Sequence, residues 1–120
     1  IIWVGSNDDN DINKQLSSSF GINATNQFSV LELIELGKHA AFAVTNDSAP
    51  MHILSCSDIP IYALFGPTNP KRTHALGQGN RVISVPLTFP LDDSKFTPSK
   101  ISKISLSSVL DKIKKDKIIT

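Results

Sequence analysis

Four short apolar runs occur along the chain, at residues 1–4, 40–45, 59–65 and 81–85. Runs of this length that are apolar at nearly every position are typical of strands buried on both faces of a parallel sheet. Pro60 fits the start of the third strand, where a missing N–H group costs least. Stretches with helical signals separate most of these strands. The pattern predicts a doubly wound α/β domain whose parallel sheet is covered on both faces.

A first helix is expected after the opening strand. Asp8 or Asp9 is suited to cap it, and it should run to about residue 20, with Ile12 and Leu16 on one face. The polar segment that follows shows no regular pattern.

Three more helices are expected further along the chain. Ser29 should cap a helix over residues 30–38, because Glu32 stands three positions later and completes a capping box. A short helix is expected at residues 51–57.

The last helix is expected at residues 106–115, capped by Ser105. Before it, residues 66–80 predict a long loop and residues 87–103 show no usable period. The buried stripe of the last helix should consist of Leu106, Val109, Leu110 and Ile113.

The composition is ordinary for a soluble domain. The 120 residues suffice for one domain and are 40% hydrophobic and 19% charged, with a net charge of +1. The charge forms no long basic run, so nucleic acid is not an expected partner. No apolar stretch is long enough to span a bilayer. The single Cys56 excludes an internal disulfide and favours a reducing compartment. Because the chain opens directly on a strand, residues 1–120 are interpreted as one domain of a longer protein.

The stretch TNDSAPMH, residues 45–52, follows directly on the second apolar run. Ligands of open α/β sheets bind outside the carboxyl ends of the strands. Asp47 and Ser48 are small and polar, so a ligand can approach the backbone, and Pro50 suits a first helical turn. A helix beginning there would point unpaired N–H groups at an anion, and His52 could donate to a phosphate.

Two other interpretations of this stretch stay open. Asp47 or Ser48 could serve as a helix cap, with His52 a partly buried histidine that has its own partner. A Ser-His-Asp hydrolase is a weaker alternative, because Asn46 and Pro50 stand where the G-x-S-x-G elbow has glycine. Asp47 and His52 are also too close in sequence for a convincing triad.

Two stretches resemble the C-terminal domain of bacterial ADP-heptose:lipopolysaccharide heptosyltransferases, glycosyltransferase family 9. They are SVLELIELGKHAAFAVTNDSAPMHILS and IPIYALFGPTNPKRTHALGQG. The family pattern is a strand ending in (T/S)-x-D-(S/T)-G-x-x-H, a helix, and a strand ending in (F/Y)-G-P-T-(D/N)-P. Here these segments are T-N-D-S-A-P-M-H and F-G-P-T-N-P. The resemblance implies a GT-B architecture of two Rossmann-like domains, with this chain as the nucleotide-sugar-binding half and the N-terminal domain missing.

The resemblance also implies a set of donor-binding residues. Asp47, Ser48, Ala49 and His52 match the donor-binding motif and would hold the diphosphate through backbone amides and the histidine. The remaining implied positions are Phe28 near the adenine, Asp8 or Asp9 at the ribose, and Thr68, Lys71 and Arg72 bordering the cleft. Phe28 could instead form a hydrophobic staple, and the two basic residues could form a solvated loop tip.

Two positions depart from the family pattern. Ala49 replaces a glycine that would permit positive φ and close approach of a phosphate, which puts donor binding in question. Asn69 replaces the more usual aspartate.

The function implied by the resemblance is transfer of heptose from ADP-heptose to a lipopolysaccharide core acceptor. Neither a cofactor nor a metal is expected, and the catalytic base is expected outside this chain, so the fragment alone should be inactive. The whole enzyme is expected in the cytoplasm, at most peripheral at the inner membrane. The alternatives are a non-catalytic nucleotide-binding or interaction module and another GT-B enzyme that uses a UDP-sugar.

Overall fold

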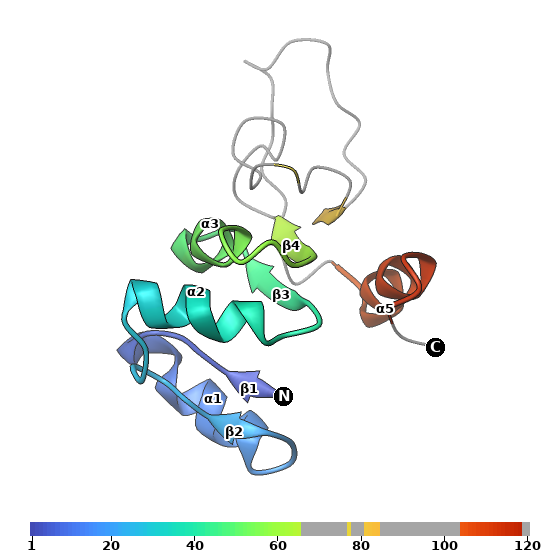
Figure 1. Ribbon diagram of the computed structural model, residues 1–120. Coiled ribbons are helices and arrows are strands. Elements are labelled where there is room, and N and C mark those ends of the chain that lie inside the picture. The colour runs from blue at the N-terminus through green and yellow to red at the C-terminus, as the bar shows by residue number, and fades with distance from the viewer. Residues whose placement is uncertain (66–76, 78–80, 85–103, 119–120) are drawn as a thin grey trace, which may run out of the picture.

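The computed structural model describes residues 1–65, 77, 81–84 and 104–118. Every strand among these residues pairs in parallel with a neighbour (Figure 1). The first sheet pairs β1 (Ile2–Trp3) with β2 (Ile22–Asn23). The second sheet has the order β3 (Ala43–Asn46), β4 (Ile61–Phe65) and β5 (Val82–Ser84). The expected α/β class with parallel strands is confirmed, and the four expected strands are present in shorter form.

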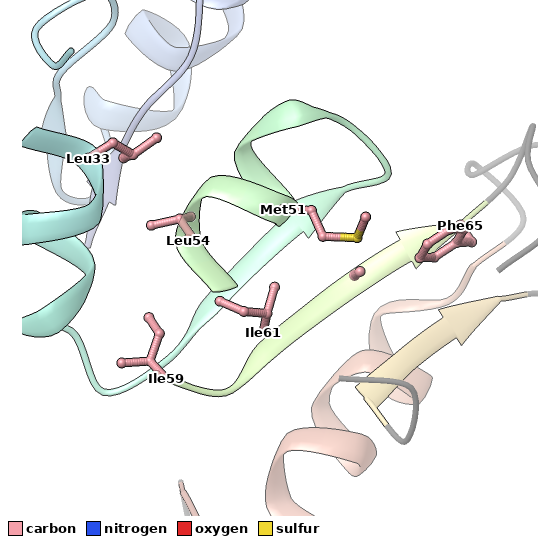
Figure 2. Packing of buried hydrophobic residues seen from close by; sticks show 7 residues of the cluster. Leu33, Met51, Leu54, Ile59, Ile61 and Phe65 are labelled. Atoms are coloured by element: carbon pink, nitrogen blue, oxygen red, sulfur yellow. The ribbon is translucent and has the colours of Figure 1, made fainter. Parts of the chain in front are cut away.

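Alternate side chains of β4 point to opposite faces of the second sheet, as the two-residue period of a strand requires. On one face lie the helices α2 (Val30–Lys38) and α3 (Ala49–Ser55), and on the other lies α5 (Leu106–Lys115). The cluster on the α2 and α3 face consists of Leu33, Met51, Leu54, Ile59, Ile61, Ala63 and Phe65 (Figure 2). The opposite cluster consists of Tyr62, Ile83 and Ile113. The second sheet is therefore covered on both faces, as expected.

The capping box at the start of α2 is present as expected. The backbone N–H of Glu32 donates to Ser29 Oγ at 3.2 Å, and the backbone N–H of Ser29 donates to Glu32 Oε1 at 3.2 Å. Ser105 caps α5 in the same way, since its Oγ accepts from the backbone N–H of Ser108 at 3.2 Å. Both helix starts are thus determined by residues within one turn of each other.

The burial expected for α5 is only partly correct. Ile113 is buried and Val109 is partly buried against the sheet. The expected stripe is wrong at Leu106 and Leu110, which are exposed. The contact of α5 with the sheet is therefore made by Val109 and Ile113, which lie four positions apart on one face of the helix.

The N-terminal segment differs more from expectation. The region that looked irregular contains β2, and a 3-10 turn, η1 (Asn7–Asp9), precedes α1 (Asn10–Ser17). The expected buried face of α1 is wrong, because Ile12 and Leu16 are exposed and Asn13 is buried. The Asn13 Nδ2 atom donates to the Val4 carbonyl at 3.3 Å and to Thr25 Oγ1 at 3.0 Å. A polar side chain therefore joins α1 to the strand region.

The expected burial of the first two strands on both faces is also wrong. Ile2 of β1 is 45% exposed and Val44 of β3 is 46% exposed. Each strand has one hydrogen-bonded neighbour among the described residues, so each forms a sheet edge. β4, with a neighbour on both sides, is buried along nearly its whole length.

The helices α2 and α3 pack closely because a glycine lies at their contact. A Cβ atom at Gly37 would overlap Ser57, just beyond α3. Ser57 is itself buried and donates from Oγ to the Ile34 carbonyl at 2.7 Å. The contact fixes the C-terminal end of α3 against α2, and with it the direction in which α3 leaves the sheet.

A buried tyrosine connects α5 to the sheet. Tyr62 is fully buried, and its Oη donates to Asp116 Oδ2 at 2.6 Å. Arg81 Nε lies 3.6 Å from the same carboxylate oxygen. Burial raises the pKa of Tyr62 to about 12; the Asp116 hydrogen bond and charge add to the shift, and Arg81 opposes it. The Phe42 ring packs edge-on, with the two ring centroids 6.0 Å apart.

Candidate functional site

The stretch TNDSAPMH lies at the carboxyl end of β3, where the strand turns into α3. Asp47 still pairs with the sheet, since its backbone N–H donates to the Leu64 carbonyl at 3.1 Å. Because β4 runs parallel to β3, its end at Phe65 lies at the same edge of the sheet. This is the edge outside which open α/β sheets bind their ligands.

The turn from strand to helix is short. Ser48 is extended, with φ −157° and ψ 178°, and α3 begins at Ala49, two residues before the expected start. Pro50 lies in the first turn, where its missing N–H group is not needed. Met51 is fully buried, and its N–H donates to the Ser48 carbonyl at 3.0 Å. The buried methionine therefore holds the loop at the sheet edge.

The loop keeps backbone donors available. Asp47 and Met51 use their N–H groups within the protein, whereas those of Ser48 and Ala49 have no acceptor within the described part of the chain. Ser48 occupies the N-cap position, but its side chain makes no capping hydrogen bond. The capping interpretation therefore holds for the position of Ser48 and not for its hydroxyl group. Two adjacent N–H groups on exposed residues can donate to an anionic oxygen.

Ala49 is compatible with the backbone of this loop. The described non-glycine residues with positive φ are Asn26, Asp58 and Lys117, and Ala49 is not among them. Ala49 is the first residue of a right-handed helix and is exposed. The concern that alanine would strain a left-handed position is therefore wrong. What its methyl group can still affect is how closely a ligand approaches.

Asp47 and His52 are the ionisable groups of the loop. Asp47 is partly buried, and this burial raises the pKa of its carboxyl group, while the charge of His52 lowers it in part. His52 is exposed in the second half of the first turn of α3. The carboxyl group is therefore close enough to sense the imidazole, and the imidazole remains accessible from solvent.

Thr45 is a site residue to which the sequence pattern gave no role. Its Oγ1 atom is buried and has no hydrogen-bond partner among the described residues. An unpaired buried hydroxyl group is uncommon and costs stability. The available signal was a threonine ending an otherwise apolar strand beside two polar residues.

Comparison with protein families identifies the chain. The model of glycosyltransferase family 9 (heptosyltransferase) matches residues 1–97, which include the whole loop and β3, β4 and β5. The chain belongs to glycosyltransferase family 9.

Two known proteins show the extent of the similarity. The chain is 34% identical over 64 residues to lipooligosaccharide heptosyltransferase 2 of Haemophilus influenzae (strain ATCC 51907 / DSM 11121 / KW20 / Rd), which covers 53% of this chain and 18% of that protein. The crystal structure of the glycosyl transferase family 9 from Veillonella parvula DSM 2008 matches with a TM-score of 0.75 at 23% identity. That match covers 95% of this chain and 35% of the Veillonella parvula protein. In both comparisons the matched region is therefore about a third or less of the other protein's length. The structural match supports the expected GT-B type of fold.

The other residues implied by the family 9 pattern are less clearly connected to the loop. Asp9 is engaged locally, since its Oδ2 accepts from the Ser6 backbone N–H at 2.8 Å and lies 3.3 Å from Ser6 Oγ. Asp9 occupies the N-cap position of α1, as expected, but its side chain makes no capping hydrogen bond to that helix. Asp8 is exposed after β1, and Phe28 is 36% exposed just before α2. The implied positions outside the described residues are Thr68, Lys71 and Arg72.

Neither a metal-ligand cluster nor a membrane-spanning helix is found in the described part of the chain. Within residues 1–65, 77, 81–84 and 104–118, no group of three His, Cys, Asp or Glu side chains could hold a metal ion. None of the helices described is long and apolar enough to cross a membrane.

Proposed function

We propose that this chain is the donor-binding part of a glycosyltransferase that moves heptose from ADP-heptose to a lipopolysaccharide core acceptor. The observation that carries the proposal is the family 9 match, which includes a loop with accessible N–H groups at the carboxyl end of β3. The name of the Haemophilus influenzae relative supports heptose as the sugar and a lipooligosaccharide as the type of acceptor.

In this proposal the loop holds the donor diphosphate. The N–H groups of Ser48 and Ala49 donate to phosphate oxygens, and the exposed imidazole of His52 supplies a third donor. Negative charge grows on the diphosphate as its bond to the sugar breaks. Donors fixed in place before the reaction stabilise that charge without a metal.

The acceptor hydroxyl must lose a proton during the transfer, which calls for a general base. We assign this base to a part of the polypeptide outside these 120 residues, in the N-terminal domain that the resemblance implies. The enzyme would then work in the cytoplasm, peripheral at the inner membrane where its acceptor lies.

Calorimetric titration of the complete polypeptide with ADP, UDP and ADP-heptose tests the proposal. His52→Ala should weaken ADP binding about tenfold, which corresponds to one charge-assisted hydrogen bond of about 1.4 kcal/mol. His39→Ala is the matched control, because His39 is exposed at the end of α2 and lies 3.6 Å from Glu35 Oε1, outside the loop. Unchanged ADP affinity in the His52 variant would contradict the assigned role.

The same titration separates the alternatives. Binding of UDP in preference to ADP would favour an enzyme that uses a UDP-sugar. Ala49, in place of the glycine of the family pattern, is the feature that favours a non-catalytic module, so Ala49→Gly belongs in the series. If neither the natural protein nor this variant binds any of the three ligands, the module becomes the better description.

A further inference from the structure

The loops that follow β1 and β2 are joined by hydrogen bonds beyond the ends of the two strands. The backbone N–H of Asn26 donates to the Gly5 carbonyl at 2.9 Å, and the side-chain Nδ2 of Asn26 donates to Asn7 Oδ1. Both asparagines are exposed, so their contact lies at the surface of the protein. Because β1 and β2 are parallel, the contact stands at the carboxyl edge of the first sheet, the kind of edge outside which ligands bind.

Asn26 has the backbone conformation of a turn residue. Its φ is 57°, in the left-handed region that asparagine tolerates and glycine adopts without steric cost. The N–H of Gln27 donates to the Ala24 carbonyl at 3.2 Å, which closes the turn around Asn26. Glycine would serve this turn equally well, but only a side chain can reach Asn7. The Asn26 amide group therefore does more than form the turn.

Each side of the Asn7–Asn26 contact leads to an exposed side chain. Asp8 follows Asn7, and its carboxylate has no hydrogen bond or ion pair within the described ranges. Phe28 comes two residues after Asn26 and is 36% exposed just before α2. The contact thus fixes the loop that carries a free carboxylate against the loop that carries an exposed aromatic ring.

The helix α2 relates this contact to the stretch at residues 45–52. It ends at Lys38, and β3 begins at Ala43, so the helix and the strand meet at one end. Figure 1 shows α2 running back beside β3, so the start of α2 lies toward the end where β3 turns into α3. The Asn7–Asn26 contact, just before α2, therefore lies on the same side of the protein as Asp47.

We propose that Asn26 is a positioning residue for the nucleoside of the donor and acts through its side-chain bond to Asn7. The bond holds the Phe28 ring where it can pack against the base, since aromatic rings stack on the face of any base. It also holds the Asp8 carboxylate where it can accept hydrogen bonds from ribose hydroxyl groups. The inference rests on the proposed function, because it concerns the nucleoside end of the same donor.

Calorimetric titration of the complete polypeptide with ADP and with inorganic pyrophosphate tests the inference. Asn26→Gly keeps the turn and removes the amide group, so ADP binding should weaken about tenfold, within the range that stacking of one base contributes. Pyrophosphate has no nucleoside, so its affinity should stay unchanged. Asp58→Gly is the matched control, because Asp58 also has a positive φ, 58°, but lies between α3 and β4. It should change neither affinity.

A second variant shows whether the effect passes through Asn7. Asn7→Ala removes the acceptor of the side-chain bond without altering the turn, and it should weaken ADP binding by about as much as Asn26→Gly. The double variant should bind ADP within about twofold of either single variant, because both changes break one contact. Losses that add in full would overturn the assigned contact.

The outcomes separate this inference from the proposed function. Suppose that the natural protein binds ADP and that His52→Ala weakens this binding. If Asn26→Gly then leaves ADP affinity unchanged, or weakens pyrophosphate binding as much as ADP binding, the inference is overturned and the proposed function stands. If the natural protein binds no ADP, the proposed donor is wrong and the inference falls with it.

Discussion

The helices α2 and α3 both begin after an extended serine, but their first turns are built differently. At α2 the side chain of Ser29 and that of Glu32 bond to each other's backbone N–H groups. At α3 the side chain of Ser48 makes no capping bond, and the N–H groups of Ser48 and Ala49 have no acceptor in the described residues. The first start satisfies its own N–H groups, whereas at the second two N–H groups have no acceptor among the residues that the structure describes.

The pKa values of the carboxyl groups near the two helix starts are shifted in opposite directions. Hydrogen bonds from Ser29, first through its side chain and then through its backbone, lower the pKa of Glu32. Burial raises the pKa of Asp47, and the charge of His52 only partly offsets this effect. The pKa of the carboxyl group is thus lowered at the start of α2 and raised beside the start of α3, where burial disfavours the charged form. The comparison predicts that changes at α2 alter stability and changes at the start of α3 alter binding.

The largest effect on stability is expected from the core beneath α2. Leu33→Ala should lower the free energy of unfolding by about 2–3 kcal/mol, because it removes a buried side chain and leaves a cavity. Leu31→Ala on the same helix is the control; Leu31 is 78% exposed, and a change below about 0.5 kcal/mol is expected. Urea unfolding measures both, and similar losses for the two variants would contradict this assignment of the core.

The two serines give the most direct test of the comparison. Ser29→Ala should cost about 1 kcal/mol of stability through loss of the cap and leave ADP affinity unchanged. Ser48→Ala should change stability little, because its hydroxyl caps nothing. Equal losses of unfolding free energy in the two variants would show that the starts of α2 and α3 do not differ.

Glu32→Ala should have a smaller effect that depends on pH. Because the pKa of Glu32 is lowered in the folded protein, its carboxylate adds stability above the ordinary value of 4.5, and this is lost as the pH falls through the lowered pKa. The melting temperature of the variant should therefore lie below that of the natural protein at pH 7. Melting curves should converge in acid, and a gap that stays constant with pH would argue against a carboxylate effect.

Asp47→Asn should give the smallest effect, with the opposite sign. The raised pKa means that, as the pH rises above the ordinary value of 3.8, the unfolded chain releases the Asp47 proton before the folded protein does. Stability is then lost with rising pH, and asparagine avoids this loss. Relative to the natural protein, the variant should gain stability between pH 3 and pH 7 in thermal melts. A relative loss over that range would mean that the pKa is lowered.

Features determined by neighbouring residues could be predicted from the sequence. The capping box at Ser29 and the cap at Ser105 each lie within a single turn, and the bounds expected for those two helices match the structure. The face of α1 could not be predicted, because Asn13 is buried through partners on distant segments, Val4 and Thr25. The exposure of Ile2 and Val44 depends on which strands stand beside them, and periodicity within one strand does not contain that information.

The candidate site likewise has local features that the sequence predicts and tertiary features that it does not. The place of the loop after an apolar strand, with Pro50 in the first helical turn, followed from the sequence. The backbone conformation of Ala49 did not, because the family's glycine suggested a positive φ that this helix start does not use. Thr45 Oγ1 is buried with no hydrogen-bond partner among the described residues, and this depends on its tertiary surroundings, which no local sequence pattern records.

The hydrogen bond between Tyr62 and Asp116 joins residues 54 positions apart and holds the two ends of the intervening segment together. The entropy of closing a loop grows only with the logarithm of its length, so doubling such a segment costs about 0.6 kcal/mol. Insertions and deletions in this segment are therefore cheap as long as both ends stay attached. Relatives can therefore differ in the length of chain between these two residues, while the hydrogen bond keeps α5 anchored to the sheet.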